Sequence, residues 1–100
     1  MQTLAIEGEM TIYTAADQKT ALLDFLNTDD VLEINLASVN EMDTAGLQLL
    51  ILIKREAAKL GKTLRFVMHS KVVLEILELS RLTNTFGDQV VLSPNEESSR

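Results

Sequence analysis

One short segment of the sequence carries residues whose types and spacing suggest chemistry. Asp43-Thr44-Ala45-Gly46 combines a carboxylate, a hydroxyl group and two small residues, and it precedes a long helix-forming stretch. Asp43 stands where a helix N-cap is expected, because its carboxylate can accept hydrogen bonds from the free N–H groups of the first turn. Thr44 then falls at about the first helical position. The segment therefore predicts an exposed hydroxyl beside a carboxylate at a helix start.

Gly46 is unusual at this place. Glycine in a helix costs about 1 kcal/mol relative to alanine, so its presence in the first turn needs a reason. It can open the backbone to close approach by a ligand or another protein. Alternatively, it lets the helix lie close on its own sheet.

The stretch that follows is apolar around almost the whole circumference of the expected helix. Residues 47–53 read LQLLILI, whereas a surface helix usually shows a single apolar stripe. Two interpretations remain open. The helix is covered on both sides within the fold, which we favour, or part of it forms a docking patch for another protein.

Signatures of enzymes and of bound cofactors are missing elsewhere in the sequence. Cysteine is absent, which excludes disulfides, thiolate metal sites and a catalytic cysteine. Neither a P-loop nor a GxGxxG pattern occurs, and no EF-hand spacing suggests a metal. The single histidine, His69, is interpreted as a solvated or capping residue, and Asp29-Asp30 as solvated charge. We expect a protein that is not an enzyme and binds no cofactor or metal.

Composition and charge narrow the remaining classes. The chain has 100 residues, 46% of them hydrophobic, and a net charge of −6. This is the size and composition of one globular domain, which we place at residues 1–93, with residues 94–100 as a flexible polar tail. The acidic charge argues against binding of nucleic acid through its phosphates. No signal peptide or membrane-spanning run is apparent, so a cytoplasmic protein is expected.

The hydrophobic periodicity predicts the elements that position the Asp43–Gly46 segment. A hairpin of two short strands around Gly8 opens the chain, and a dense apolar strand, expected to be covered on both faces, starts at Val31 and ends near Leu36. Helices are expected at 15–26, 45–60 and 71–79, with Thr14 and Ser70 as possible caps and Gly61 as the C-terminal stop of the second. Further strands are expected at 63–68 and, after a Gly87-Asp88 turn, at 90–92. The order β-β-α-β-α-β-α-β predicts a small α/β sandwich, with helices packed on a mixed, mostly parallel sheet.

The stretch from Val31 to Val67, with Asp43-Thr44-Ala45-Gly46 between a buried strand and a helix, resembles the STAS domain family of bacterial anti-sigma factor antagonists. The segments 8–13 and 61–64 are also similar to the family's pattern, and the resemblance spans roughly residues 4 to 92. It implies a regulatory protein that binds a serine/threonine kinase, itself an anti-sigma factor, and a resetting phosphatase. It leaves the oligomeric state open.

The resemblance also implies roles for individual residues. It makes Thr44 the phosphate acceptor, Asp43 the flanking acid and Ala45-Gly46 the surface that the partner approaches. Residues expected near this surface, and therefore expected to support partner binding, are Ser38, Asn40, Met42, Leu47, Ser70 and Lys71. The sequence departs from the common pattern by having threonine as acceptor, by having Ala45 in place of a second hydroxyl residue, and by the few residues that follow Leu92.

Physical reasoning is consistent with such a switch. Phosphate on Thr44 would add about −1.5 to −2 charges, which a helix N-terminus tolerates but a docked partner need not. Three alternatives stay open. One is a constitutive STAS subunit of a lipid-transport ABC complex, with the 47–53 helix docked on its ATPase. The second is an adaptor in chemotaxis or biofilm signalling. The third, a small-molecule sensor, ranks last.

Overall fold

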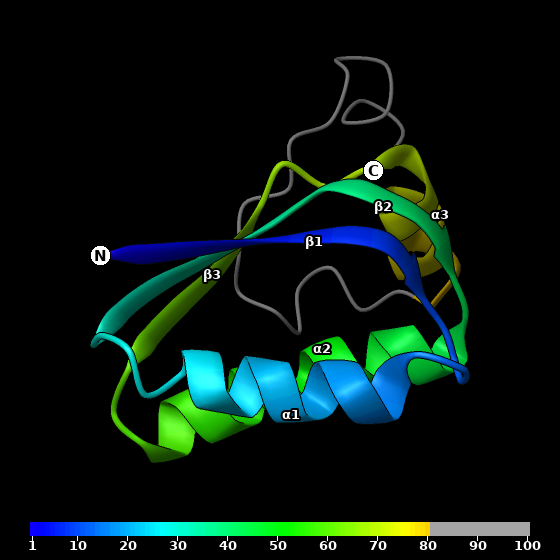
Figure 1. The fold of residues 1–100 in the computed structure, drawn as a ribbon. Helices are drawn as coiled ribbons and strands as arrows, with labels where there is room; N and C mark the ends of the chain where they lie inside the picture. Colours follow the sequence, from blue (N-terminus) through cyan, green and yellow to red (C-terminus); the bar gives the residue numbers. More distant parts are fainter. Residues whose placement is uncertain (81–100) are drawn as a thin grey trace.

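The computed structural model describes residues 1–80 of the chain. Strands and helices alternate in the order β1 (Gln2–Met10), α1 (Ala15–Phe25), β2 (Val31–Met42), α2 (Thr44–Lys59), β3 (Thr63–Val67) and α3 (Lys71–Ser80) (Figure 1). The three helices are those that the periodicity predicts, within two residues at each end. The closing strand expected at 90–92 and the Gly87-Asp88 turn lie outside the described residues.

The described strands form a parallel sheet in the order β1-β2-β3. Leu32 of β2 pairs with Gln2 of β1 on one side and with Leu64 of β3 on the other. Helices α1 and α2 lie together beneath one face of this sheet, and α3 lies close to β2 (Figure 1). Each helix connects or follows parallel strands, as parallel pairing requires. The predicted α/β class with helices packed on a mostly parallel sheet is confirmed.

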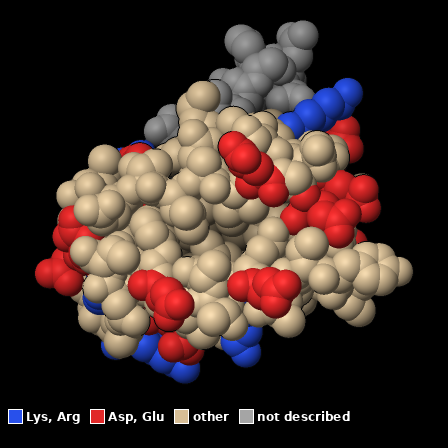
Figure 2. All heavy atoms as spheres, viewed as in Figure 1, with Lys and Arg blue, Asp and Glu red and all other residues tan. Residues whose placement is uncertain are grey.

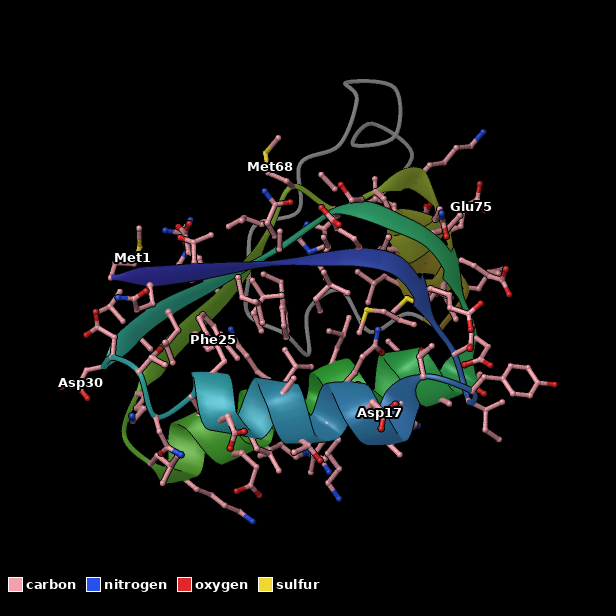
Figure 3. The ribbon with its side chains drawn as sticks, in the orientation of Figure 1. Met1, Asp17, Phe25, Asp30, Met68 and Glu75 are labelled. Carbon is pink, nitrogen blue, oxygen red and sulfur yellow. The ribbon has the colours of Figure 1, made fainter. Side chains whose placement is uncertain are left out.

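One hydrophobic core fills the space between the sheet and the helices. Leu32, Ile34 and Leu36 of β2 are fully buried, whereas the intervening Glu33 and Asn35 are only partly so. This alternation is that of a strand covered on one face, so the expectation that β2 is covered on both faces is wrong. The helices contribute buried side chains to the same core, among them Phe25, which lies between α1 and the sheet (Figure 3).

The expected N-terminal hairpin is also wrong, because β1 is a single nine-residue strand. Gly8 adopts a φ of +85°, which glycine reaches without strain. Here the positive φ of Gly8 occurs at a register shift within the strand rather than in a turn. Gly8 pairs with Val39 and Glu9 pairs with Glu41, which leaves Asn40 as an extra residue on β2. Such bulges bend strands, and β1 and β2 curve together toward the start of α2 (Figure 1).

Two end signals behave as the sequence predicts. Gly61 follows α2 with a φ of +70°, and the N–H groups of Gly61 and Lys62 donate to Ala58 and Ala57 at 3.1 and 2.9 Å, which is a Schellman ending. Ser70 caps α3 by accepting from the N–H of Val73 at 3.4 Å.

Thr14 and His69 differ from their predicted roles. Thr14 occupies the N-cap position of α1 but makes no side-chain cap bond. His69 is buried, so its interpretation as a solvated residue is wrong.

Candidate functional site

Asp43 is the only residue between β2 and α2, and its carboxylate joins two distant segments. One oxygen, Oδ1, accepts from the N–H groups of Ala45 and Gly46 at 2.9 and 3.2 Å. The other, Oδ2, accepts from the N–H of Ile12 at 3.0 Å. The N-cap role expected for Asp43 is therefore confirmed. Its bond to Ile12 holds the turn after β1 against the start of α2.

These hydrogen bonds stabilise the charged form of Asp43. Its pKa lies below the ordinary value of 3.8, first because the Ile12 N–H donates to the carboxylate, and then because the Gly46 and Ala45 N–H groups do. Partial desolvation acts in the opposite direction. Asp43 is consequently an anion throughout the physiological pH range.

Thr44 begins α2, and its side chain is exposed. Two further carboxylates lie at this end of the sheet, because Glu9 and Glu41 are paired neighbours at the ends of β1 and β2. Acidic side chains gather where these two strands end, at the right of Figure 2. The hydroxyl of Thr44 is therefore presented to solvent next to Asp43, in an acidic part of the surface.

Gly46 is buried, and its neighbours show why this residue is glycine. A Cβ atom built at Gly46 would lie 2.1 Å from the carbonyl oxygen of Met10, far inside van der Waals contact. The N–H of Asp43 donates to the same oxygen at 3.3 Å. Gly46 therefore lets α2 lie directly against the end of β1, and the predicted role of Gly46 as a partner-facing surface is wrong in this structure.

The apolar run of α2 divides between the core and a groove. Leu47, Leu49, Leu50 and Ile53 are buried, which favours the burial interpretation and corrects the expectation that Leu47 faces a partner. Ile51 and Leu52 are only half-buried and line an open groove between α1 and α2, of about 420 Å³. Ala45, which follows Thr44, lines the same groove. The two interpretations of this helix thus apply to different sides of it.

The structure brings some predicted partner-binding residues together and separates others. Met42 directly precedes Asp43, and Asn40 is exposed on the bulge two residues earlier. Ser38 pairs with Glu7 farther back along the sheet. The N–H of Ser70 donates to the carbonyl oxygen of Leu36 at 3.2 Å. Leu36 precedes Met42 by six residues, which is about 20 Å along a strand. Ser70 and Lys71 therefore lie away from Thr44, and a shared surface with it is not supported.

Two large exposed side chains near Asp43 are not predicted by the sequence pattern. Ile12 and Tyr13 are 69% and 89% exposed, although large apolar side chains usually avoid water. In the expected hairpin Ile12 belongs to the second strand, because Met10 and Ile12 alternate with polar residues. The lack of any turn signal other than Gly8 left no indication that β1 ends at Met10.

The turn that carries Ile12 and Tyr13 is held by a dense set of hydrogen bonds. The N–H of Thr11 donates to the Thr14 hydroxyl at 3.0 Å, and that hydroxyl lies 3.2 Å from the carbonyl oxygen of Glu9. The side-chain amide of Gln18 donates to the same Glu9 oxygen at 2.8 Å. With the bond from Ile12 to Asp43, the turn is fixed on both sides. Ile12 and Tyr13 are thus presented on a preorganised turn beside Thr44.

Features of other functional classes are missing from the described part of the chain. Within residues 1–80, no group of three or more histidine and acidic side chains is placed to hold a metal ion. None of the helices in this range has the length and apolar character needed to cross a bilayer.

Comparison with known proteins places this geometry in a family. The family model described as MlaB, STAS domain, matches residues 1–92. Among solved structures, a protein of Thermotoga maritima assigned as an anti-sigma factor antagonist superposes with a TM-score of 0.75 at 21% identity, over 97% of this chain and 83% of its own. The anti-sigma factor antagonist SpoIIAA in its unphosphorylated form gives 0.64 at 14% identity, covering 96% and 83% of the two chains.

A third solved structure comes from a transport protein. The STAS domain of a SulP transporter from Vibrio cholerae superposes with a TM-score of 0.65 at 20% identity, over 89% of this chain and 73% of its own. At these identities the likeness to the solved structures concerns the fold. Since the family model covers nearly the whole chain, and the parallel sheet with its Asp43-capped helix agrees with it, the protein belongs to the STAS domain family.

Proposed function

We propose that this protein is a phosphorylation-controlled binding protein of the anti-sigma factor antagonist type, with Thr44 as the phosphate acceptor. It acts by binding rather than by catalysing a reaction. In this proposal the unphosphorylated protein binds a serine/threonine kinase, which modifies Thr44 and thereby releases it, and a phosphatase restores the hydroxyl. The observation that carries the proposal is the exposed Thr44 hydroxyl at the first position of α2, directly after the Asp43 cap.

The hydrogen bonds of Asp43 give this switch a physical basis. A helix N-terminus usually accommodates a phosphate through its free N–H groups, but here Asp43 already occupies those of Ala45 and Gly46. A phosphate on Thr44 would either compete with Asp43 for these donors or stay in solvent beside it. In both cases the negative charge of the surface around Thr44 rises by about 1.5 to 2 units.

This added charge would weaken a tight complex in two ways. A partner that packs against Thr44 would have to desolvate the phosphate together with Asp43, and burying unpaired charge is costly. If the phosphate displaced Asp43, the N–H of Ile12 would lose its acceptor, and the turn that carries Ile12 and Tyr13 would lose one of its fixed points. The modification would therefore alter both the charge and the shape of the binding surface.

Charge substitution at Thr44 tests the proposal. The partner kinase is first identified by co-purification with the unphosphorylated protein from its own cells, and its affinity is then measured by isothermal titration calorimetry. We expect Thr44→Ala to bind as the wild type does. Thr44→Glu should bind at least tenfold more weakly, a loss of about 1.4 kcal/mol, because it places one negative charge in the interface.

The matched control is Thr63→Glu. Thr63 is also exposed, but it lies at the start of β3, at the opposite end of a parallel sheet from Thr44. Thr63→Glu brings the same change in net charge as Thr44→Glu and should leave the affinity for the partner unchanged. Equal affinities of Thr44→Glu and Thr44→Ala would exclude the switch and favour a constitutive subunit, for which a membrane ATPase would co-purify without phosphate on Thr44.

A further inference from the structure

We infer that the groove between α1 and α2 binds an acidic amphipathic helix of the partner protein, lying directly beside Thr44. The inference rests on the proposed function only in assigning this helix to the partner that responds to Thr44. The groove itself is defined by nine residues, namely Ala15, Ala16 and Lys19 of α1 and Ala45, Gln48, Leu49, Ile51, Leu52 and Arg55 of α2.

The spacing of these residues suits a helix as the occupant. On α2, Ala45, Gln48, Leu52 and Arg55 follow one another at intervals of three, four and three residues, which forms a single stripe along a helix. On α1, Ala15 and Lys19 are one turn apart. Two side-by-side helices that present such stripes create the kind of groove into which a third amphipathic helix fits.

Small side chains leave the room for such a helix. Ala15, Ala16 and Ala45 line the end of the groove near Thr44, and the half-buried Ile51 and Leu52 provide apolar surface. The volume of about 420 Å³ accepts apolar side chains from a helix that lies across it. From Ala45 to Arg55 the groove extends about 15 Å, at 1.5 Å per residue.

The charge of the groove differs from that of the molecule. The protein carries a net charge of −6, yet among residues 1–80 the charged side chains that line the groove are Lys19 and Arg55, one from each helix. Asp17 is about 160° around α1 from both Ala15 and Lys19, and Figure 3 shows it on the side of α1 turned away from α2. A helix with glutamate or aspartate beside its apolar face would therefore find complementary charge on both walls.

The groove is also continuous with the candidate switch. Ala45 belongs to the groove and directly follows Thr44, so a helix that fills the groove ends next to the Thr44 hydroxyl. Negative charge on Thr44 would then face an already acidic helix. This arrangement explains how one modification could weaken a complex whose main contacts lie along α1 and α2.

Two synthetic helices test the inference without the native partner. One is a hydrocarbon-stapled peptide with leucine along one face and glutamate on both flanks, and the other carries lysine in place of every glutamate. Binding to the full chain is followed by ¹H–¹⁵N NMR. We expect saturable shifts at the amides of the groove residues, and an affinity at least tenfold higher for the glutamate peptide.

Variants of the two cations provide the specific control. Lys19→Glu/Arg55→Glu should reverse the preference between the peptides, whereas Lys59→Glu/Arg65→Glu, which makes the same charge change at exposed residues outside the groove, should not. Equal binding of both peptides, or shifts that map elsewhere, would overturn the inference. So would broadening of the groove signals with protein concentration alone, which would indicate a second copy as the occupant.

The outcome is separable from that at Thr44. The peptide experiment does not depend on any modification of Thr44, and the Thr44 variants do not depend on the peptides. If only the peptides do not bind as expected, the groove is not the binding site of the helix, and the proposed switch at Thr44 is unaffected. If only the Thr44 variants fail, the groove remains a binding site for a partner that is not controlled by phosphorylation.

Discussion

Asp43 is the residue on which the geometry of the candidate site depends. Its carboxylate accepts three hydrogen bonds from backbone N–H groups, two at the start of α2 and one from Ile12, which is 31 residues away in the sequence. The cap itself could be predicted from sequence, because acidic residues before a helix are favoured for this role. The bond to Ile12 could not, since nothing local in the sequence shows that the turn after β1 reaches α2.

Replacement of Asp43 by alanine should destabilise the protein. All three N–H donors would lose their acceptor, and we expect the melting temperature to fall by several degrees, as for the loss of other N-caps. Asp24→Ala, which removes an exposed aspartate from α1, is the matched control and should have little effect. Differential scanning calorimetry measures both. A melting temperature unchanged by Asp43→Ala would show that the carboxylate does not hold α2 and the turn together.

The stabilisation by Asp43 should also depend on pH with a defined sign. Because its pKa is lowered in the folded protein, the charged carboxylate stabilises the fold fully above the ordinary value of 3.8. That contribution is lost as the pH falls below 3.8 through the lowered pKa. The stability difference between the wild type and Asp43→Ala should therefore shrink below this pH in urea unfolding experiments. A difference that stays constant would contradict the role given to the charged form.

Gly46→Ala gives a prediction of unusual sign. Alanine normally stabilises a helix by about 1 kcal/mol relative to glycine. Here the new methyl group would lie 2.1 Å from the Met10 carbonyl oxygen, so β1 and α2 must separate. We expect a net loss of about 1 to 3 kcal/mol, as for other overpacked sites. Urea unfolding measures this loss, and a variant as stable as the wild type would contradict the close packing of α2 on β1.

At the level of elements, helices were predicted well and strands less so. The helices carry an apolar periodicity, and Gly61 adds a stop signal for α2; these are local properties of the sequence. The strands depend on pairing between distant segments. The alternation of buried and exposed residues on β2 breaks after Leu36, where the register with β1 shifts between Ala5 and Glu7, and the next buried residue is Val39. The pattern therefore predicts a strand end near Leu36, although β2 continues to Met42. Because glycine is also typical of tight turns, Gly8 predicts a hairpin, although it lies within the single strand β1.

The turn after β1 is the element that sequence patterns did not reveal. Tyr13 is 89% exposed, on a turn that hydrogen bonds fix beside Asp43, and exposed aromatic residues on a preorganised surface often contribute most to binding. Tyr13→Ala should weaken binding of the partner at least tenfold in calorimetry and leave the melting temperature unchanged. Tyr13→Phe is the conservative control. If Tyr13→Ala binds the partner with unchanged affinity, Tyr13 is not part of the binding surface.

At the scale of the whole molecule, charge is distributed unevenly. Glu9 and Glu41 are paired neighbours where β1 and β2 end, and Asp43 directly follows β2. Acidic side chains gather in this area, at the right of Figure 2. Lys19 and Arg55 line the groove between α1 and α2. At the other end, the N-terminal ammonium group pairs with Asp29 at 2.8 Å, near Met1 and Asp30 in Figure 3. The acidic cluster and the basic groove both adjoin Thr44, so charge added there acts on both.

The family and the fold could be inferred from the sequence because the Asp43–Gly46 segment and the helix periodicity agree with each other. The individual roles could not all be inferred. Gly46 and Leu47 are interior residues, and Ser70 lies too far along β2 to join Thr44. Proximity in these cases depends on how far β2 extends and how closely α2 approaches β1, which only the packed structure determines.

Control of binding by phosphate on Thr44 can be measured with the modified protein itself. The partner's affinity is measured by calorimetry for the unmodified chain and for the chain phosphorylated completely at Thr44, with mass spectrometry confirming the position. We predict that the phosphorylated protein binds about 100-fold more weakly, which corresponds to about 2.7 kcal/mol. Equal affinities of the two forms would show that phosphate on Thr44 does not control binding.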